Sequence, residues 1–212
     1  MSAARRCVLA SGNQGKLAEL RELLLEARLE LEVVSQGDLG VSAAAEDGLT
    51  FVENALAKAR HAAQATGLPA IADDSGLCVD ALGDAPGVRS ARYAGIAADD
   101  RANVLKLLDA LRAVPEQDRG ARFCCVLVAL DSADDPAPLI ASGEWQGRIA
   151  HSPRGSGGFG YDPVFLDPAT GKTAAELTPA AKNRVSHRGR ALRALAQRLQ
   201  TKYAAMRPAS CG

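Results

Sequence analysis

Short apolar runs alternate with stretches of helical periodicity along the chain. The apolar runs predict buried strands, and they cover residues 7–10, 31–34, 71–72, 77–79 and 122–131. In the periodic stretches, apolar residues recur every three or four positions, which predicts helices with one buried face. These residues are Leu17, Leu20, Leu24 and Ala27 in the first stretch, Val104, Leu107, Leu108 and Leu111 in a later one, and Leu192, Leu195, Ala196 and Leu199 in the last.

Local signals set the ends of several predicted helices. Thr50 and Glu53 have the spacing of a capping box, which predicts a long helix that starts there and ends before Gly67. Asp99 can cap the helix that follows it, because its carboxylate can accept a backbone N–H of the first turn. Pro179 suits the first turn of the last helix, which we expect to continue without a break.

The order of these elements favours one α/β domain. Segment 132–138 is rich in turn-forming residues, so 139–145 is expected to return as the hairpin partner of strand 122–131. Strands that alternate with helices, together with this hairpin, predict a sheet of mixed direction. We find no internal repeat and no linker, which predicts a single domain over 1–203 and a disordered tail over 204–212.

Composition and charge narrow the function classes. The chain of 212 residues has 25 Lys and Arg against 25 Asp and Glu, so its net charge gives no support to a nucleic-acid or membrane-surface partner. No apolar run approaches the roughly 20 residues of a membrane span, and no signal peptide is expected. The five cysteines lack the spacing of a disulfide framework or a zinc site, which favours a reducing cytoplasm.

Two adjacent carboxylates interrupt the apolar residues of 71–79. Asp73 and Asp74 are followed by Ser75 and Gly76, and we predict a strand, a polar break and a second strand. A carboxylate pair at a strand end can bind a hard cation and activate water. Adjacent residues of a strand point to opposite faces, so the two acids need not share one role. An ordinary turn is the alternative, because Asp, Ser and Gly form turns.

Two loops carry further candidate chemistry. Residues 11–16 read Ser-Gly-Asn-Gln-Gly-Lys between a predicted strand and a helix, and this arrangement can offer backbone N–H groups to a phosphate. The Walker A spacing is absent, and an ordinary connection is the alternative. Loop 37–48 carries Glu46 near its end, which is either a solvated surface charge or a metal ligand.

The C-terminal third holds a glycine-rich stretch and a basic helix. Residues 155–163 contain four glycines within six positions, and Phe159 and Tyr161 among them could stack on a base. A hairpin connection is the alternative. In the last helix, His187 and Arg188 follow a serine, and this set of side chains suits a base carbonyl or a phosphate. A solvated basic face is the alternative there.

Six motifs in one order give these separate signals a common meaning, and with them the sequence resembles the inosine triphosphate pyrophosphatase family in its bacterial form. The resemblance runs from about Cys7 to Leu199. The motifs are Ser11-Gly12-Asn13-x-Gly15-Lys16, Thr50-Phe51-x-Glu53-Asn54-Ala55, Ala72-Asp73-Asp74-Ser75-Gly76-Leu77, Ser90-Ala91-Arg92-Tyr93, Gly157-Gly158-Phe159-Gly160-Tyr161-Asp162-Pro163 and Ser186-His187-Arg188.

The resemblance implies an activity and a fold. The activity is hydrolysis of ITP, dITP and XTP to the monophosphate and pyrophosphate, with Mg²⁺ as cofactor and a homodimer as the assembly. The implied fold is α/β, with an elongated mixed central sheet flanked by helices and two lobes that hold the active site in the cleft between them.

The resemblance also assigns roles to single residues. Asp74 is the implied proton acceptor and a metal ligand, and Glu46 is the second acidic group near the metal. Relatives often carry two acids before the position of Gly48, whereas this chain has Ala45 and Glu46. The residues implied to bind substrate are Ser11, Gly12, Asn13, Gln14, Gly15 and Lys16 for the triphosphate, Ser75, and Phe159, Gly160, Tyr161, Asp162, Lys182, His187 and Arg188 for the nucleoside and its base.

Elementary chemistry supports such a site and leaves competitors open. A triphosphate carries about four negative charges, which Mg²⁺ and Lys16 would offset during in-line attack. Asp74 could take a proton from water or hold the metal that acidifies it. The competitors are a non-hydrolysing nucleotide-binding regulator, a metal-dependent phosphatase of small phosphate esters and, least favoured by the charge balance, a nucleic-acid-binding module.

Overall fold

The computed structural model describes residues 5–95, 97 and 99–205, and this part of the chain divides into two compact units. The first unit comprises residues 5–74, 126–142 and 191–205. The second comprises the described residues of 75–125 and 143–190. Residues 204 and 205, which we assigned to a tail, belong to the last helix, and 206–212 lie outside the described residues. A single domain over 1–203 stays a prediction.

The strands and helices confirm a mixed α/β fold. The strands are β1 Arg5–Leu9, β2 Leu31–Ser35, β3 Ala70–Val79, β4 Gly120–Leu130, β5 Leu139–Ile149 and β6 Phe165–Leu166. The helices are α1 Gln14–Glu26, α2 Phe51–Thr66, α3 Asp100–Ala110, α4 Pro179–Val185 and α5 His187–Ala205. The strands are hydrogen-bonded in the order β2-β1-β3-β4-β5-β6. β1 is parallel to β2 and β3, whereas β6 is antiparallel to β5.

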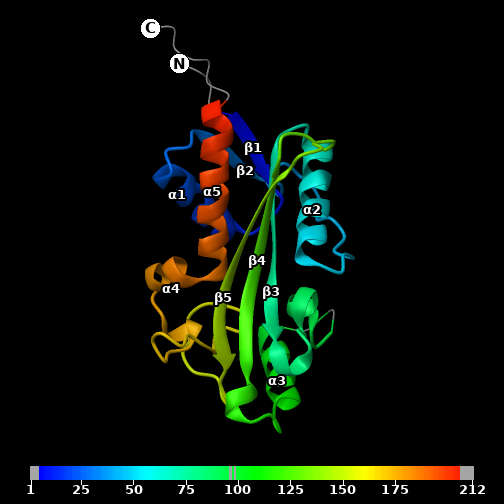
Figure 1. Ribbon diagram of the computed structural model, residues 1–212. Coiled ribbons are helices and arrows are strands. Elements are labelled where there is room, and N and C mark those ends of the chain that lie inside the picture. The colour runs from blue at the N-terminus through cyan, green and yellow to red at the C-terminus, as the bar shows by residue number, and fades with distance from the viewer. Residues whose placement is uncertain (1–4, 96, 98, 206–212) are drawn as a thin grey trace. The chain divides into compact units, whose positions relative to one another are not determined.

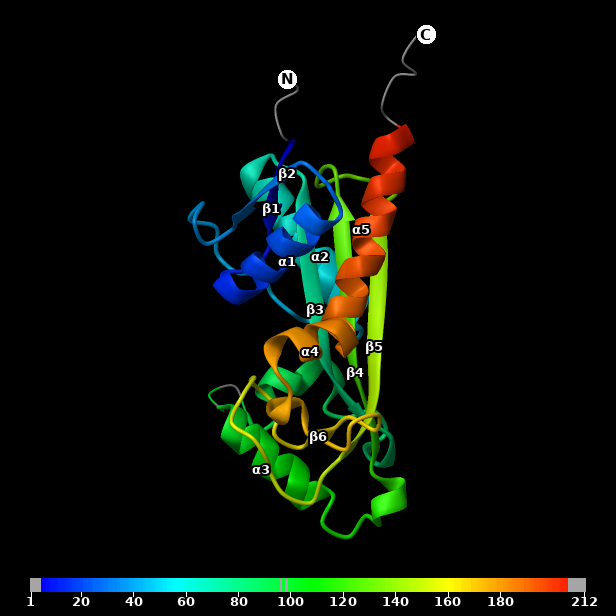
Figure 2. The same cartoon turned by 90° about the vertical axis from the view of Figure 1, so that its left-hand side faces the viewer.

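Within the first unit, helices cover both faces of the sheet. Figure 1 shows α2 on one face and α1 and α5 on the other, and the view in Figure 2 agrees. Successive side chains of a strand point to opposite faces of the sheet, so a helix on each face buries the side chains that point toward it. The side chains packed with α2 are Val8, Ala10, Ala70, Ala72, Val128 and Leu130, and α2 meets them with Ala55, Ala59, Ala62 and Ala63. Because the fully buried α2 side chains there are alanine methyl groups, the helix can lie close to the sheet.

The predicted start and end of α2 are confirmed. The Thr50 hydroxyl accepts the Glu53 backbone N–H at 3.3 Å, and the Glu53 carboxylate accepts the Thr50 backbone N–H at 2.8 Å, which completes the capping box. Gly67 ends the helix with φ 68°, a left-handed conformation that glycine adopts without steric cost. The cap at Asp99 is confirmed as well, because its carboxylate accepts the Ala102 N–H at 2.7 Å.

Two predicted boundaries are wrong. We expected a polar break at 73–76, but β3 is one continuous strand of ten residues, because both aspartates have a lysine partner and can stay buried in extended backbone. We also expected one helix from Pro179 onward, but Ser186 has extended backbone with ψ 155° and separates α4 from α5. The Ser186 hydroxyl accepts the Gly189 N–H at 3.2 Å and so caps the start of α5.

A buried arginine joins two backbone segments of the second unit. Arg119 is 2% exposed. Its guanidinium donates to the carbonyls of Leu111 at 2.7 Å, Ile149 at 2.8 Å and Ala150 at 3.1 Å. These are the end of α3 and the end of β5 with the residue that follows it. The side chain therefore donates hydrogen bonds to carbonyls that are buried near the core of this unit and would otherwise lack this donor.

We expect Arg119→Met to lower the free energy of unfolding by about 3 kcal/mol, because the methionine fills space but leaves several buried carbonyls without their donor. Urea unfolding measures the change. Arg112→Met is the matched control, since the Arg112 side chain is 82% exposed and its ion pair with Asp109 lies at the surface. Equal stability losses in the two variants would show that Arg119 has no special role in the fold.

Candidate active site

The two aspartates of β3 point to opposite faces of the sheet and have different partners. Both Asp73 oxygens accept from the Lys16 ammonium on α1, at 3.0 and 2.9 Å. Asp74 instead accepts from Lys58 on α2 at 2.9 Å. Both aspartates are buried, with 4% and 8% of their surface exposed. The contacts therefore agree with the prediction that the two acids need not share one role.

The predicted phosphate loop lies at the N-terminus of α1. Asn13 caps the helix, because its side-chain oxygen accepts the Lys16 backbone N–H at 3.1 Å, and the Ser11 hydroxyl accepts the Asn13 N–H at 3.1 Å. Gly12, Asn13, Gln14 and Gly15 are exposed to solvent. An exposed helix N-terminus with a lysine beside it suits a bound phosphate. The structure thus brings Ser11 to Lys16 together with Asp73.

Asp74 belongs to a connected cluster with Asn54, Lys58 and Glu46. The Lys58 ammonium donates to Asp74 at 2.9 Å and to Glu46 at 2.8 Å. The Asn54 amide donates to the other Asp74 oxygen at 3.1 Å. Sequence reasoning placed Asp74 and Glu46 in a site but missed Asn54 and Lys58. Their separation by four residues in α2 puts both on one helix face, and this spacing was the available signal.

Burial and neighbouring charges tune the cluster. Burial raises the pKa of the Asp74 carboxyl above its usual range, and the charge of Lys58 and the hydrogen bonds from Lys58 and Asn54 offset part of this increase. Burial alone would lower the pKa of Lys58, but the charges of Asp74 and Glu46 and their hydrogen bonds outweigh it and raise the pKa. Lys58 therefore stays protonated, and Asp74 is a stronger base than an exposed aspartate.

The same cluster is the place where a hard cation fits. Glu46 and Asp74 both approach one ammonium, so two carboxylate oxygens can converge on one positive charge. Within the described residues, no group of three or more His, Cys, Asp or Glu side chains could hold a metal ion. Mg²⁺ needs no such cage, since it often binds through one or two carboxylates together with substrate phosphates and waters. The two acids therefore fit a metal that arrives with a phosphate ligand.

The second unit gathers an exposed aromatic ring and two cations. Phe159 is 60% exposed. The Lys182 ammonium lies 4.8 Å from its ring centroid, and the Arg188 guanidinium carbon lies 5.8 Å away. Asp162 pairs with Lys182 and accepts the Phe159 backbone N–H at 2.8 Å, so it orients both. An exposed ring with donors beside it suits a planar heterocycle.

Three other predicted site residues of this unit contact protein groups in the structure. Tyr161 is 4% exposed and its hydroxyl donates to the Ser90 carbonyl at 2.9 Å, so its ring is a core side chain here, and the stacking prediction rests on Phe159. The His187 ring stacks on Phe123 with a centroid distance of 4.8 Å. The Ser75 hydroxyl lies 3.5 Å from the Arg188 guanidinium.

The glycine-rich stretch has a fixed geometry. The Gly160 backbone N–H donates to the Asp100 carboxylate at 2.7 Å. Gly158 has φ 76°, and a Cβ atom there would collide with the carboxylate of Asp162. This position therefore requires glycine for two reasons, its backbone angle and the lack of space. The stretch lies in the connection between the antiparallel strands β5 and β6, as the hairpin alternative predicted, and it also holds Phe159 through the Asp162 carboxylate.

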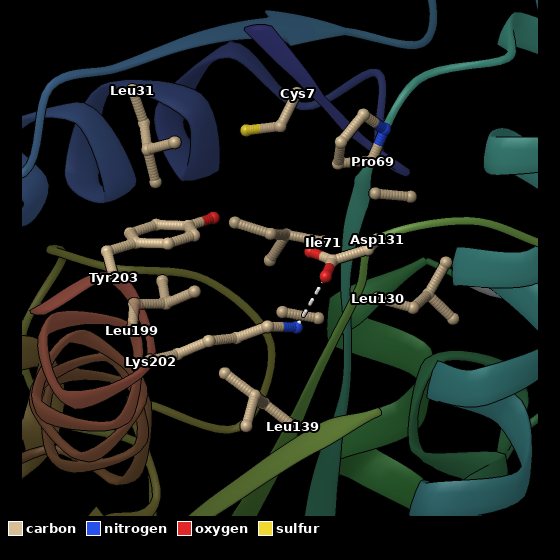
Figure 3. Close-up of a pocket in the computed structure, with 12 residues that line it drawn as sticks. Cys7, Leu31, Pro69, Ile71, Leu130, Asp131, Leu139, Leu199, Lys202 and Tyr203 are labelled. Carbon is tan, nitrogen blue, oxygen red and sulfur yellow. Dashed lines mark ion pairs between the residues drawn. The ribbon is translucent and has the colours of Figure 1, made fainter. Parts of the chain in front are cut away.

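The first unit also contains a small cavity, which differs from these clusters because most of its lining is apolar. Figure 3 shows it between apolar residues of β1, β3, β4 and α5, beside an ion pair of 2.8 Å between Lys202 and Asp131. Its volume is about 10 Å³. Such a space holds about one water molecule and no nucleotide.

Several known proteins resemble this chain over most of its length. The dITP/XTP pyrophosphatase of Yersinia pseudotuberculosis serotype I is 61% identical over 196 residues, which cover 92% of this chain and 98% of that protein. The dITP/XTP pyrophosphatase of Xanthomonas campestris pv. campestris is 60% identical over 195 residues, which cover 92% of this chain and 97% of that protein.

Solved structures give the same result. The HAM1 protein of Coxiella burnetii superposes with a TM-score of 0.88 at 52% identity, and the match covers 93% of this chain and 99% of that chain. The nucleoside-triphosphatase or dITP/XTP pyrophosphatase of Mycobacterium abscessus gives a TM-score of 0.75 at 45% identity, covering 90% of this chain and 97% of that one. The Ham1 family model matches residues 7–198, so the resemblance inferred from the motifs is confirmed and the chain belongs to the Ham1 family.

Proposed function

We propose that the protein hydrolyses dITP, XTP and ITP to the nucleoside monophosphate and pyrophosphate. The observation that carries this proposal is the arrangement around β3, where one aspartate holds a lysine beside the phosphate loop and the next belongs to a basic and acidic cluster. The names of the Yersinia pseudotuberculosis and Xanthomonas campestris relatives support the substrate class.

The residues of the first unit have distinct parts in this reaction. The exposed loop 11–16 and the Lys16 ammonium bind the triphosphate, and Asp73 orients Lys16 through its two hydrogen bonds. Asp74 takes a proton from the water that attacks the α-phosphorus, and the bond between this phosphorus and the bridging oxygen breaks to release pyrophosphate. Its raised pKa supports that role, because it brings the carboxyl closer to neutral pH.

Mg²⁺ is part of this proposal, with Asp74 and Glu46 as its protein ligands. The convergence of both carboxylates on the Lys58 ammonium supports this choice. Bound there, the ion would neutralise phosphate charge and acidify a water molecule. Lys58, protonated between the two acids, limits their mutual repulsion whenever the metal is absent.

The second unit provides the groups for base selection. The exposed Phe159 ring stacks on the base, and Lys182 and Arg188 beside it donate hydrogen bonds. Hypoxanthine and xanthine have a carbonyl oxygen at ring position 6, whereas adenine has an amino group. An arginine can only donate, so it matches the oxygen and not the amino hydrogens. His187 lies next to Arg188 in α5 and takes part through its packing on Phe123.

A panel of nucleotides with Mg²⁺ tests the function. We expect pyrophosphate release from dITP, XTP and ITP and little from dATP. Binding without turnover would favour a nucleotide-binding regulator, and hydrolysis of p-nitrophenyl phosphate but not dITP would favour a small-ester phosphatase. Phosphate instead of pyrophosphate as the product would contradict the proposed bond cleavage.

A homodimer and a cytoplasmic location complete the proposal. The homodimer rests on the family resemblance, and light scattering of the purified protein tests it. The cysteines at 7, 78, 124 and 125 form no disulfide within the described residues, which is compatible with a reducing compartment. Among the described helices, none is long and apolar enough to cross a bilayer.

Lys16→Ala is expected to raise the KM for dITP about tenfold, because the loss of one charge-assisted contact to the triphosphate costs about that factor. Steady-state kinetics measures it, with thermal unfolding in parallel. Lys202→Ala is the matched control, since it also removes the lysine of a lysine–aspartate pair in the first unit. If both variants lose stability equally and keep a normal KM, Lys16 is only a structural partner of Asp73.

A further inference from the structure

One amide side chain closes the acid cluster into a ring. Asn54 is 1% exposed. Its oxygen accepts the Gly48 backbone N–H at 2.8 Å, and its NH₂ group donates to Asp74 at 3.1 Å. Gly48 lies two residues after Glu46, which is connected back to Asp74 through Lys58. The ring therefore contains both proposed metal ligands and the backbone from Glu46 to Gly48.

The orientation of this amide is fixed by chemistry. A backbone N–H can only donate, so the Asn54 oxygen must face Gly48 and the NH₂ group must face Asp74. Gly48 also has to be glycine for this contact, because a Cβ atom there would lie 2.7 Å from the Asn54 oxygen and 2.8 Å from the Glu53 Cβ. The glycine and the asparagine are thus matched to each other.

We propose that Asn54 is a positioning residue that holds the Asp74 carboxylate and the Glu46-bearing loop in one fixed relation. Its NH₂ group donates to Asp74, and it acts through that carboxylate. An amide donor sets the direction of one carboxylate oxygen and leaves its charge unchanged. The same amide holds the end of loop 37–48, which fixes the position of Glu46 relative to Asp74.

This inference rests on the proposed function, in which Asp74 is the base. Residues that orient a catalytic or metal-binding group typically contribute a factor of about 10 to 100. We therefore expect Asn54→Ala to lower kcat for dITP about 10- to 100-fold, with KM changed less than about threefold, since triphosphate binding depends on α1.

Two further variants separate the two contacts of the amide. Asn54→Asp keeps an oxygen for the Gly48 N–H but puts a second carboxylate against Asp74, so kcat should fall at least as far as in Asn54→Ala. Gly48→Ala keeps the donor but crowds the amide, and it should lower kcat by about tenfold. Asn103→Ala is the matched control, because Asn103 is also buried, at 2%, and its side chain forms hydrogen bonds with the backbone of Ala91 and Ala94.

Hydrogen exchange on the metal-free protein gives a readout that does not depend on turnover. The amides of 37–48 should exchange at least about tenfold faster in Asn54→Ala and near the normal rate in Asn54→Asp. Asn103→Ala should lower the thermal midpoint without changing kcat or this exchange.

The experiment distinguishes failure of the inference from failure of the function. Normal kcat and normal exchange in Asn54→Ala, together with an inactive Asp74→Asn, would overturn the inference alone. Turnover by Asp74→Asn at the normal rate would overturn the proposed function. An equal loss of kcat in Asn103→Ala would show that general destabilisation is the cause. If Asn54→Ala does not fold, normal kcat in both Asn54→Asp and Gly48→Ala overturns the inference.

Discussion

Replacing Asp74 with asparagine is expected to lower kcat for dITP by about a hundredfold or more, which is the range for loss of a general base. The amide has the size of the carboxylate but cannot take a proton from water. The fold should survive, because burial already makes the charged form of Asp74 costly and Lys58 keeps its pair with Glu46. Measuring kcat at saturating dITP and Mg²⁺, with circular dichroism as a check of folding, tests this expectation.

The neighbouring aspartate provides the control. Asp73→Asn removes an equal charge from the same strand, but its partner is Lys16 and its face is that of α1. We expect KM to rise several-fold and kcat to change little, because the effect is on triphosphate binding. If the two variants lose kcat equally, the separation of roles between the two aspartates is wrong.

The second large effect concerns the choice of base. Arg188→Ala is expected to lower kcat/KM for ITP about a hundredfold and to narrow the ITP-over-ATP ratio by about tenfold or more, because a hydrogen-bond donor that faces ring position 6 donates to the oxygen of hypoxanthine and rejects the amino group of adenine. The guanidinium lies beside the Phe159 ring, where it can reach the edge of a stacked base. The measurement is kcat/KM for ITP, ATP and GTP in each variant.

Arg190→Ala is the control for this prediction, because Arg190 lies two residues further along α5 and donates to the Glu144 carbonyl at 2.9 Å. It should leave the substrate ratio unchanged. His187→Ala should narrow the ratio less than Arg188→Ala, since its ring is stacked on Phe123 and acts through packing. An unchanged ITP-over-ATP ratio in Arg188→Ala would move base selection to Lys182 and the loop around Phe159.

Local sequence signals predicted the parts of the fold that local physics determines. The capping box at Thr50 and the glycine after α2 depend on contacts within a few residues, and both are found in the structure. The opposite orientation of Asp73 and Asp74 follows from strand geometry, and their contacts with different helices agree with it.

The errors at β3, Tyr161 and Lys58 share a physical cause, which is a partner far away in the sequence, whereas the missed break at Ser186 depends on a local cap. Asp73 and Lys16 are separated by 57 positions, so nothing near 73–76 indicated that the strand could continue through two acids. Tyr161 donates to a carbonyl 71 positions away and is therefore buried. Lys58 reads as an ordinary surface lysine of a helix until β3 is placed beside it.

The buried alanines of α2 limit which substitutions the protein can accept at these positions. Ala55 and Ala59 directly follow Asn54 and Lys58 in the chain, and both are completely buried against the sheet. Their methyl groups act as a spacer that sets the distance from the helix axis to β3, and so to Asp74. A larger side chain there would push the helix outward, and a displacement of about 1 Å can cost a factor of a hundred in rate. A larger side chain beneath α2 would thus reduce the rate of the reaction more than it reduces the stability of the fold.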